Sequence, residues 1–377
     1  IDTLPQLLRD IVKPFDVSAR DTFDFELCTS IKRINLVGCG DSHHASLGAE
    51  LAFNRFTGVP TQAFSALTYG RYNVMHMPKT GPNTNLTIAV SVSGVVVRTI
   101  EALTLARKAG AIGVALTGNP NAKLAQSADK VFKTTVPPLP DEMRGMIVPG
   151  VRSYLASQIG LMTAAIRIGE VRGNITTTEA DRLRAELLSL GDIMESLIRI
   201  CEPICEQIIA AWDDVREFVF VGAGPLYGSA MFSAAKILEA SGDTAYAQET
   251  EEWSHIQYFA APVRIPTILL DANGGDADRM AEVARAAQSI ERRVIGVLPQ
   301  GEEKISAWVD TVIPVPAQIR EEFASILYSI PGTILAAARA KAIGSEYFQG
   351  FGGGRTVDWA QGASRIYDSN MIEDLRP

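Results

Sequence analysis

Short apolar runs alternate with amphipathic segments along most of this 377-residue chain. In the first half, the apolar runs predict β-strands, and the segments between them, whose apolar residues recur at helical spacing, predict α-helices. The predicted strands are 34–37, 61–64, 86–92, 113–116 and 130–134, and the main predicted helices are 42–56 and 98–108. Apolar strands that alternate with helices are typical of a parallel sheet covered on both faces, so the pattern predicts an α/β fold.

The second half of the chain repeats this order of elements. Its predicted strands are 218–221, 267–270, 294–297 and 311–315, and its predicted helices are 229–240 and 276–289. In each half an apolar run leads directly into Gly-x-Gly, at Gly38-Cys39-Gly40 and at Gly222-Ala223-Gly224. Similarity at about half the chain length indicates a duplicated domain, because the units of a solenoid are only roughly 20 to 50 residues long. The sequence therefore predicts two doubly wound, parallel-sheet domains, each with three layers in the order α/β/α.

These patterns divide the chain into five parts. The predicted parts are a helical lead-in at 1–30, a first domain at 31–170, connecting helices at 171–214, a second domain at 215–343 and a tail at 344–377. Within the lead-in we expect a helix from Leu4 to Val12 that Pro14 ends. The tail combines glycines with aromatic and charged residues, and we expect it either to cover a site or to pack on the surface.

Composition and charge exclude several classes of function. With 47% hydrophobic and 21% charged residues, the chain has the composition of a soluble globular protein. The net charge is −8 and no run of Lys or Arg could follow a phosphate backbone, so we expect no nucleic-acid partner. No apolar run is long enough to cross a bilayer and the amino terminus has no signal pattern, so we expect a cytoplasmic protein with no membrane partner. The four cysteines lack the spacing of a disulfide framework or a metal site.

The first Gly-x-Gly turn has the features of an anion site. The segment 38–42 lies where a strand ends and a helix begins, so its backbone amides and the helix dipole favour negative charge there. Ser42 adds a hydroxyl group. The turn is not a dinucleotide fingerprint, because His43 stands where a third glycine is needed, and it is not a Walker loop, because no Gly-Lys-Ser/Thr follows.

A second turn, Ser91-Val92-Ser93-Gly94, also follows a buried strand and precedes a helix. Ligands of doubly wound sheets bind beyond the carboxyl ends of the strands, so two such turns on neighbouring strands can converge on one anion. The serines could instead be ordinary helix caps. The matching turn at 38–42 favours binding over capping.

The two turns resemble the phosphosugar-binding turns of sugar isomerase (SIS) domains. The duplication resembles the tandem-SIS isomerase portion of glucosamine-6-phosphate synthase and its relatives, which include sugar-phosphate deaminases and fructosamine deglycases. The resemblance covers about residues 30 to 340 and implies two flavodoxin-like SIS domains and a homodimer. The substrate anion is then expected to be held by residues of the two turns and their surroundings, namely Gly40, Asp41, Ser42, His43, Arg71, Ser91, Ser93 and Gly94.

Arg71 belongs to Gly70-Arg71-Tyr72, which matches an Arg-Tyr pair of the family, although a structural salt bridge would also explain an arginine here. No glutaminase domain precedes the two repeats, so glutamine-dependent amination is not expected.

The catalytic candidates lie in the second half, in Glu252-Trp253-Ser254-His255. Residues three apart on a helix share a face, and a carboxylate beside an imidazole suits proton transfer between adjacent sugar carbons. The resemblance implies that Glu252 is the isomerising base and that His255 shapes the site or assists ring opening. The other interpretation is that the acidic residues of 248–252 only stabilise the first turn of a helix.

Three features depart from the family pattern. Val96 stands where the family has a final hydroxyl, so one hydrogen bond to the anion would be missing. A hydrogen bond to a charged group is worth roughly 1.5 to 3 kcal/mol, so this loss would weaken the preference for phosphate. No lysine follows Lys341, whereas relatives carry one in a carboxyl-terminal loop; Arg355 or Arg365 could stand there but cannot form a Schiff base. A further helix-start motif is matched only loosely, by the segment 151–154.

From these observations we expect an enzyme that interconverts the aldose and ketose forms of a sugar phosphate, without a cofactor or a metal. A carboxylate or sulfonate could replace the phosphate. The alternatives are a deaminase or deglycase that acts on an amino-sugar phosphate or fructosamine phosphate, and a sensor that binds a sugar phosphate without catalysis.

Overall fold

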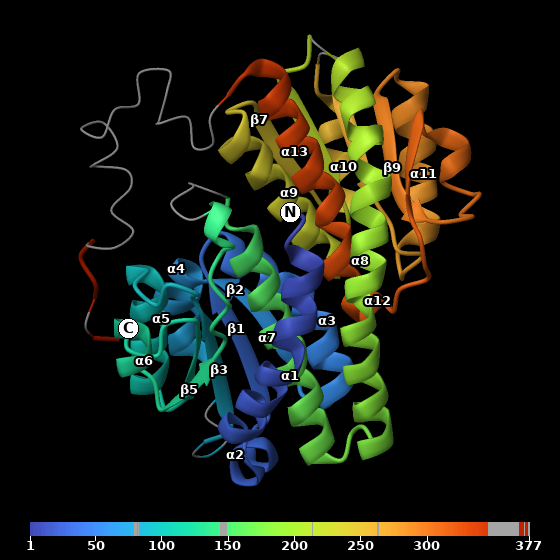
Figure 1. The fold of residues 1–377 in the computed structure, drawn as a ribbon. Helices are drawn as coiled ribbons and strands as arrows, with labels where there is room; N and C mark the ends of the chain where they lie inside the picture. The colour runs from blue at the N-terminus through green and yellow to red at the C-terminus, as the bar shows by residue number, and fades with distance from the viewer. Residues whose placement is uncertain are drawn as a thin grey trace. The chain divides into compact units, whose positions relative to one another are not determined.

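The computed structural model describes residues 1–78, 81, 83–143, 149–212, 214–261, 264–345, 369–372, 374 and 375. The chain forms two compact units (Figure 1). The first unit comprises Gln6–Arg144, Arg152–Gly191 and Gln361–Pro377. The second unit comprises Ile1–Pro5, Gly145–Val151 and Asp192–Ala360. Each unit contains one parallel sheet.

The sheet of the first unit has five strands in the order β2-β1-β3-β4-β5. The strands are β1 (Arg33–Gly38), β2 (Thr61–Ser65), β3 (Asn85–Val90), β4 (Ile112–Thr117) and β5 (Lys130–Lys133). All neighbouring strands are parallel. Chain order departs from spatial order between β2 and β3, so the carboxyl ends of β1 and β3 lie side by side at the point where ligands of such sheets bind. The predicted α/β fold is confirmed.

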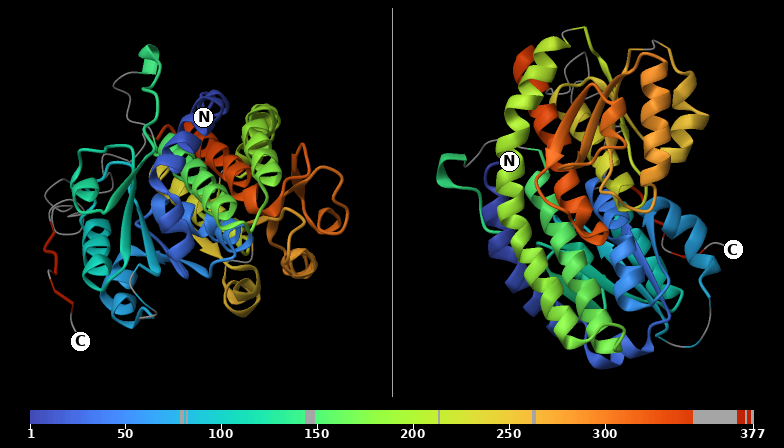
Figure 2. Two further views of the ribbon diagram at one scale, coloured as in Figure 1. Left: turned by 90° about the horizontal axis from the view of Figure 1, so that it is seen from below. Right: turned by 90° about the vertical axis from the view of Figure 1, so that its right-hand side faces the viewer.

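Helices cover both faces of this sheet (Figure 2). They are α1 (Leu4–Thr22), α2 (Phe25–Ser30), α3 (Asp41–Thr57), α4 (Ala66–Thr68), η1 (Tyr69–Asn73), η2 (Val74–His76), α5 (Val97–Lys108), α6 (Lys123–Gln126), η3 (Asp141–Met143), α7 (Val151–Arg172) and the first part of α8 (Thr177–Ala211). On one face, Gly169 of α7 approaches the backbone of Phe56 in α3. On the other, Leu105 of α5 and Tyr69 of η1 pack in one cluster with Val37 of β1. The layers are therefore α/β/α.

The expected helix break at Pro14 is wrong, because α1 runs through this residue to Thr22. Pro14 lies on the exposed side of the helix. Ile11, Phe15 and Ala19 are almost completely buried on the other side. A proline inside a helix costs about 3 kcal/mol, and burial of an apolar side chain of this size contributes roughly 1.5 to 3 kcal/mol, so packing on both sides of Pro14 outweighs its penalty.

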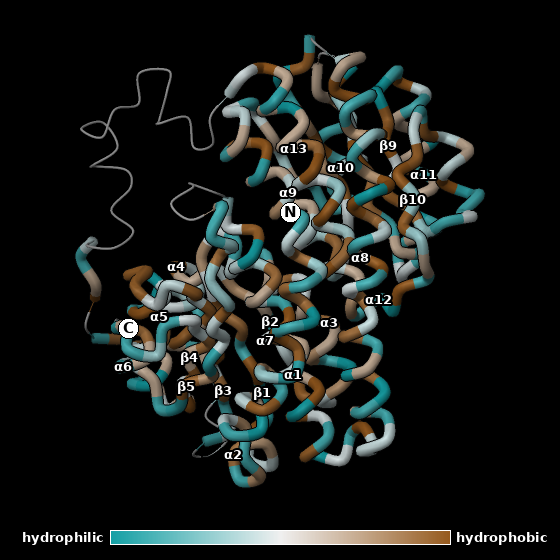
Figure 3. The backbone as a smooth tube through the Cα atoms, in the orientation of Figure 1, coloured by the Kyte–Doolittle hydropathy of each residue, from teal (hydrophilic) through white to brown (hydrophobic). Residues whose placement is uncertain are grey.

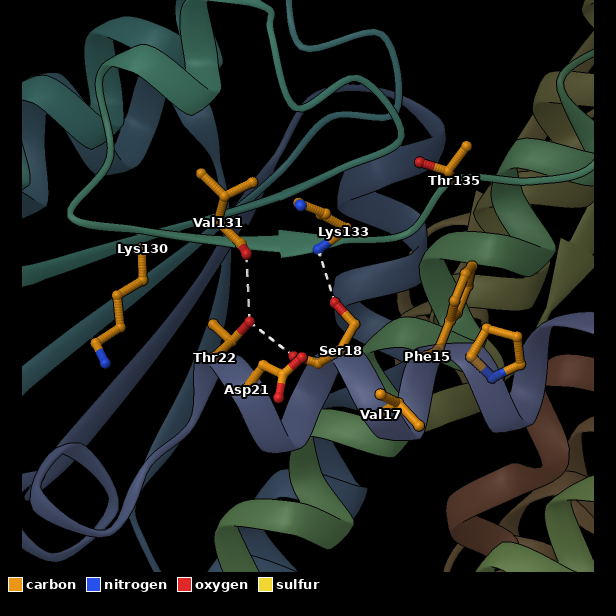
Figure 4. A pocket seen from close by; sticks show the side chains of 10 residues that line it. Phe15, Val17, Ser18, Asp21, Thr22, Lys130, Val131, Lys133 and Thr135 are labelled. Atoms are coloured by element: carbon orange, nitrogen blue, oxygen red, sulfur yellow. Dashed lines mark hydrogen bonds between the residues drawn. The ribbon is translucent and has the colours of Figure 1, made fainter.

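Helix α1 also covers the free edge of strand β5 (Figure 4). The Thr22 hydroxyl is shared between the carbonyl oxygens of Ser18 at 2.8 Å and Val131 at 3.2 Å, and the Ser18 hydroxyl accepts from the Lys133 amide at 3.0 Å. Ser18 and Thr22 are one helical turn apart, so their side chains reach the strand together. An exposed sheet edge invites pairing with another chain, and these two hydroxyls satisfy outward-facing groups of β5 instead.

The sheet of the second unit has the order β10-β9-β8-β6-β7. Its strands are β6 (Glu217–Val221), β7 (Thr244–Gln248), β8 (Pro266–Leu270), β9 (Arg293–Pro299) and β10 (Thr311–Val315). Its helices are α9 (Pro225–Ala240), α10 (Thr250–His255), η4 (Gln257–Phe259), α11 (Ala277–Ser289), η5 (Ser306–Trp308), α12 (Glu321–Tyr328) and α13 (Ile330–Ile343). When the strands are numbered from the start of each unit, both sheets have the order 2-1-3-4-5, written here from opposite ends. The topology is therefore duplicated. The edge strand β7 was missed because only one of its residues is fully buried.

Hydrophobic residues are concentrated in the strands and in the helix surfaces that face them (Figure 3). The central strands β3 and β8 are buried along their whole length. Among the described residues, the stretch Glu321–Ile343 is long and apolar enough to span a membrane, but 89% of its apolar window is buried inside the protein. That burial is typical of a core helix, and α12 and α13 form part of the core of the second unit.

The two Gly-x-Gly turns have nearly the same backbone. Gly40 has φ 52° and ψ −128°, and Gly224 has φ 51° and ψ −129°. A Cβ on Gly38 would lie 2.7 Å from the backbone of Ser42, and a Cβ on Gly222 would lie 2.9 Å from that of Leu226. In both units the helix starts so close to the strand that only glycine fits before it.

Candidate functional site

A cavity of about 320 Å³ lies at the carboxyl ends of β1 and β3 in the first unit. Its lining is rich in hydroxyl groups and consists of Asp41, Ser42, Ser91, Val92, Ser93, Val96, Ser153, Tyr154 and Ser157. Four residues that the sequence assigned to one site, Asp41, Ser42, Ser91 and Ser93, thus meet here. The lining comes from the starts of three helices, α3, α5 and α7, whose amino-terminal ends carry partial positive charge.

The turn after β1 is held by its own backbone. The Ser42 amide donates to the Cys39 carbonyl at 3.1 Å, and the His43 amide donates to the Gly40 carbonyl at 2.9 Å. Asp41 lies in the first turn of α3, where its carboxylate is 3.8 Å from Nδ1 of His44. Gly40 shapes this turn and does not line the cavity.

The turn after β3 presents two serines in different environments. Ser91 is 3% exposed, and its amide continues the sheet by donating to the Leu116 carbonyl at 3.0 Å. Ser93 is exposed. The Gly94 amide donates to Ser91 Oγ at 3.2 Å, so it is used within the turn. Gly94 has φ 68°, and a Cβ there would lie 2.6 Å from that of Ala122, so its role in the structure is to close the turn.

Helix α7 contributes hydroxyls that the sequence analysis recognised poorly or missed. Val96 lines the cavity with an apolar side chain at the position where the resemblance to SIS domains led us to expect a hydroxyl. Ser153 belongs to the segment 151–154, and Ser157, one turn further along α7, was not predicted from the sequence as part of the site. The Ser157 hydroxyl donates to the Ser153 carbonyl at 3.0 Å. The i, i+4 spacing of Ser153 and Ser157 places both on one face of the helix, and this spacing was the sequence feature that could have predicted Ser157.

The cavity is polar without being cationic. Among its described lining residues there is no Lys, Arg or His, and Asp41 carries a formal negative charge. An anion bound here would therefore depend on hydroxyl groups and on the helix starts, which are a common means of binding phosphate. The carboxylate of Asp41 favours hydroxyl or ammonium groups next to that anion.

The structure places His43 beside the site without bringing it into the cavity lining. His43 is half-buried in the first turn of α3, and its ring centroid lies 6.2 Å from that of His44. Burial lowers the pKa of His43, so its imidazole is neutral at pH 7.

Arg71 lies in η1 and forms a salt bridge. Its Nε and Nη2 donate to the two carboxylate oxygens of Glu101, at 2.8 and 3.2 Å. These hydrogen bonds raise the pKa of Arg71. Arg71 does not line the cavity, and the fork of its guanidinium group is occupied by Glu101. The sequence contains no local signal for this pairing, because 30 residues separate the partners.

Glu252 and His255 belong to the second unit, on helix α10. Both are exposed. The side chain of Glu249 caps the helix by accepting from the amides of Glu251 and Glu252, at 2.7 and 3.1 Å. His255 Nε2 lies 3.0 Å from Glu251 Oε1, so the imidazole is paired with Glu251 rather than with Glu252. The Glu252 carboxylate accepts no hydrogen bond from the residues that the structure describes.

The carboxyl ends of the strands in the second unit carry carboxylates. Asp271, directly after β8, is fully buried, and burial raises its pKa to about 7. Its Oδ1 accepts from the Asn273 amide at 2.7 Å. Glu321 Oε1 accepts from the Gly275 amide at 3.0 Å. No group of three His, Cys, Asp or Glu residues within the described ranges is arranged to hold a metal ion. Arg355 and Arg365 lie outside the described residues.

A family model described as SIS domain matches residues 28–167. A glutamine--fructose-6-phosphate aminotransferase [isomerizing] from Gloeobacter violaceus is 26% identical over 340 residues. This match covers 89% of the chain and 52% of the relative. The chain therefore spans about half the length of the curated relatives it matches.

Solved structures show the same fold. The C-terminal domain of glucosamine-fructose-6-phosphate aminotransferase from Francisella tularensis matches with a TM-score of 0.77 and 18% identity, covering 92% of this chain and 95% of that one. Glucosamine-6-phosphate deaminase from Thermotoga maritima matches with a TM-score of 0.66 and 19% identity, covering 93% and 97% of the two chains.

Proposed function

We propose, since a SIS domain model matches residues 28–167, that the protein is an enzyme that interconverts the aldose and ketose forms of a sugar phosphate. The observation that carries this proposal is the hydroxyl-rich cavity at the carboxyl ends of β1 and β3. The similarity to the isomerase part of glutamine--fructose-6-phosphate aminotransferases supports a phosphosugar as the substrate class.

The phosphate group would bind at the turns that carry Ser42, Ser91 and Ser93. Ser91 is well placed for this, because its oxygen accepts from the Gly94 amide and its hydroxyl hydrogen is left to donate to a ligand. Hydrogen bonds to a charged group are each worth roughly 1.5 to 3 kcal/mol. Three helix starts add a favourable field, which compensates for the lack of a cationic side chain among the described lining residues.

The sugar would react by proton transfer through an enediol. Glu252 would remove the proton from the carbon next to the carbonyl group and return it to the neighbouring carbon, while a proton moves between the two oxygens. His255 would assist ring opening. These roles rest on the Glu-x-x-His motif and on a Glu252 carboxylate that is exposed on α10. The reaction as written needs no redox partner, because oxidation of one carbon balances reduction of the other.

A panel of aldose and ketose phosphates tests the proposal. The purified chain should exchange the transferred hydrogen of one of them with deuterium from the solvent, and Glu252→Gln should lose this exchange while it still binds the ligand. Glu303→Gln changes an exposed glutamate of the same unit and should have no effect. If no sugar phosphate binds or exchanges, the proposed function is wrong.

A second function, deamination or deglycation of an amino-sugar phosphate or fructosamine phosphate, is favoured by one observation. Asp41 places a carboxylate in the cavity lining, where an ammonium group would be stabilised. Release of ammonia or of a free amino acid would identify this reaction. Ligand binding without exchange or release would instead indicate a sensor.

A further inference from the structure

The carboxyl-terminal segment of the chain docks on helix α5 in the first unit (Figures 1 and 2). We use the name C-terminal segment for residues 369–372, 374 and 375. Arg98 Nη2 donates to Ser369 Oγ at 2.7 Å and also to the Asn370 carbonyl. The Ile372 amide donates to Glu101 Oε2 at 2.9 Å. Lys108 and Asp374 add an exposed ion pair at 3.0 Å.

Apolar contacts accompany these hydrogen bonds. Ile372 and Leu375 pack against the cluster that contains Tyr69 of η1 and Leu105 of α5. Both residues also border a hollow of about 220 Å³ beside Arg71 and Met75. Contacts that combine a partly buried hydrogen bond with apolar packing are typical of a specific docking site, whereas a lone exposed ion pair contributes little.

Glu101 is the centre of this docking site. It is 1% exposed, and its two oxygens accept from Arg71, from Arg98 and from the Ile372 amide. Burial raises the pKa of the Glu101 carboxyl, but the hydrogen bonds from Arg71 and Ile372 and the charges of both arginines outweigh it, so the pKa lies below its usual value. The carboxylate is therefore ionised at pH 7 and needs these donors.

The docking site adjoins the candidate anion site. Arg98 lies in the first turn of α5, two positions after Val96, which lines the cavity. The turn 91–94 leads directly into this helix. Contacts that hold Arg98 and Glu101 therefore also hold the helix start, and the helix start sets the positions of Ser93 and Val96.

We propose that the C-terminal segment is a latch for the anion site: when docked on Glu101 and Arg98, it holds the start of α5 in the geometry that binds phosphate. Anion binding and docking then favour each other by the same factor, because a coupling free energy between two sites is reciprocal. Glu101 is a positioning residue in this arrangement and Ile372 is its counterpart. The coupling rests on the proposed function, since it takes phosphate as the anion.

The test combines hydrogen exchange with phosphate titration on the full chain. Exchange at the Ile372 amide reports docking, and calorimetry with inorganic phosphate reports the anion site. Ile372→Ser and Glu101→Gln should both speed exchange at the segment and weaken phosphate binding by about five-fold or more. Phosphate added to the unaltered chain should slow the exchange.

Two matched variants serve as controls. Ile372→Val keeps the apolar contact and should behave as the unaltered chain does. Arg107→Gln removes an arginine of the last turn of α5 that pairs with Asp129, and it should leave both docking and phosphate affinity unchanged.

The outcomes separate the latch from the proposed function. Faster exchange with unchanged phosphate affinity in Ile372→Ser would overturn the coupling. Unchanged exchange in both Ile372→Ser and Glu101→Gln would overturn the docking role of these residues. If the unaltered chain binds no phosphate, the proposed anion site and the coupling both fail, while the exchange data still decide whether Glu101 holds the segment.

Discussion

At the carboxyl ends of the two sheets, the Gly-x-Gly turns have nearly the same backbone conformation, but the side chains nearby differ in chemistry. Gly40 and Gly224 have φ and ψ angles that agree within about a degree. After the third strand of each unit, however, the first has Ser91 where the second has Asp271. In the first unit hydroxyl groups line a cavity, and in the second carboxylates occupy the strand ends. The duplicated backbone therefore gives each unit a place where a ligand can lie, and the side chains around that place decide whether an anion can bind.

In the second unit, Glu321 supplies a carboxylate to the turn that follows β8, so this turn does not need an external anion. Its carboxylate accepts from the Gly275 amide at 3.0 Å, and a Cβ on Gly274 would come within 2.6 Å of the same oxygen. The protein thus provides its own anion to this turn. In the first unit, the Gly94 amide is bonded to Ser91, and the serine hydroxyls remain directed at the cavity.

The largest expected effect tests whether the second unit supplies the proton chemistry. Glu252→Gln should lower the turnover of a sugar-phosphate substrate by roughly 10² to 10⁴-fold, because a positioned general base contributes this much. Steady-state kinetics and ligand binding should be measured together. A variant that keeps its turnover would remove Glu252 from the mechanism and leave the second unit without a known chemical role.

The second-largest expected effect is on stability and comes from the buried carboxylate of Asp271. Asp271 has a pKa of about 7 when folded against 3.8 for an unperturbed carboxyl. Between these values the unfolded chain has lost a proton that the folded chain retains, so the free energy of unfolding falls as pH rises from about 4 to 7. Asp271→Asn removes this penalty and should stabilise the protein above pH 7 by roughly 2 to 4 kcal/mol.

Urea unfolding of Asp271→Asn and the unaltered chain at several pH values measures this difference, which should shrink toward pH 4. The same difference at pH 4 and at pH 8 would show that Asp271 does not titrate in this range.

The serine turn should respond to loss of a single hydroxyl. Ser91→Ala removes a donor to the ligand and leaves the Gly94 amide without this acceptor, so phosphate affinity should fall by roughly 1.5 to 3 kcal/mol, or about ten-fold or more. Calorimetry with a sugar phosphate measures the change. Asn273→Gly alters the matching turn of the second unit, tolerates the φ of 59° there and should leave the affinity unchanged. Equal losses in both variants would contradict the division of labour between the two sheets.

The smallest expected effect concerns Val96, an apolar residue of the hydroxyl-rich cavity lining. Val96→Thr restores a hydroxyl at the cavity lining without a large change in volume. If the hydroxyl reaches the anion, affinity for inorganic phosphate should rise by roughly three- to ten-fold, which corresponds to about 1 kcal/mol. An unchanged or weaker affinity would show that a hydroxyl at position 96 does not reach the anion.

Much of the first candidate site could be predicted from the sequence because its residues directly follow buried strands. The positions of Ser42 and Ser91 follow from the rule that parallel strands end at one edge. Ser157 could not be found in this way, because it reaches the cavity only through the packing of α7. The pairing of Arg71 with Glu101 likewise depends on the approach of η1 to α5. The catalytic roles of Glu252 and His255 remain predictions.

The sequence by itself determined the α/β class, the duplication and the glycines that begin each helix, because these depend on local alternation of apolar strands and on steric limits at one residue. The tertiary structure decided the continuation of α1 through Pro14, the burial of Asp271 and the docking of Ile372 on Glu101. Each of these depends on contacts between elements that are distant along the chain or on which face of an element is covered. Such contacts change the free energy of a residue without leaving a pattern in its neighbours.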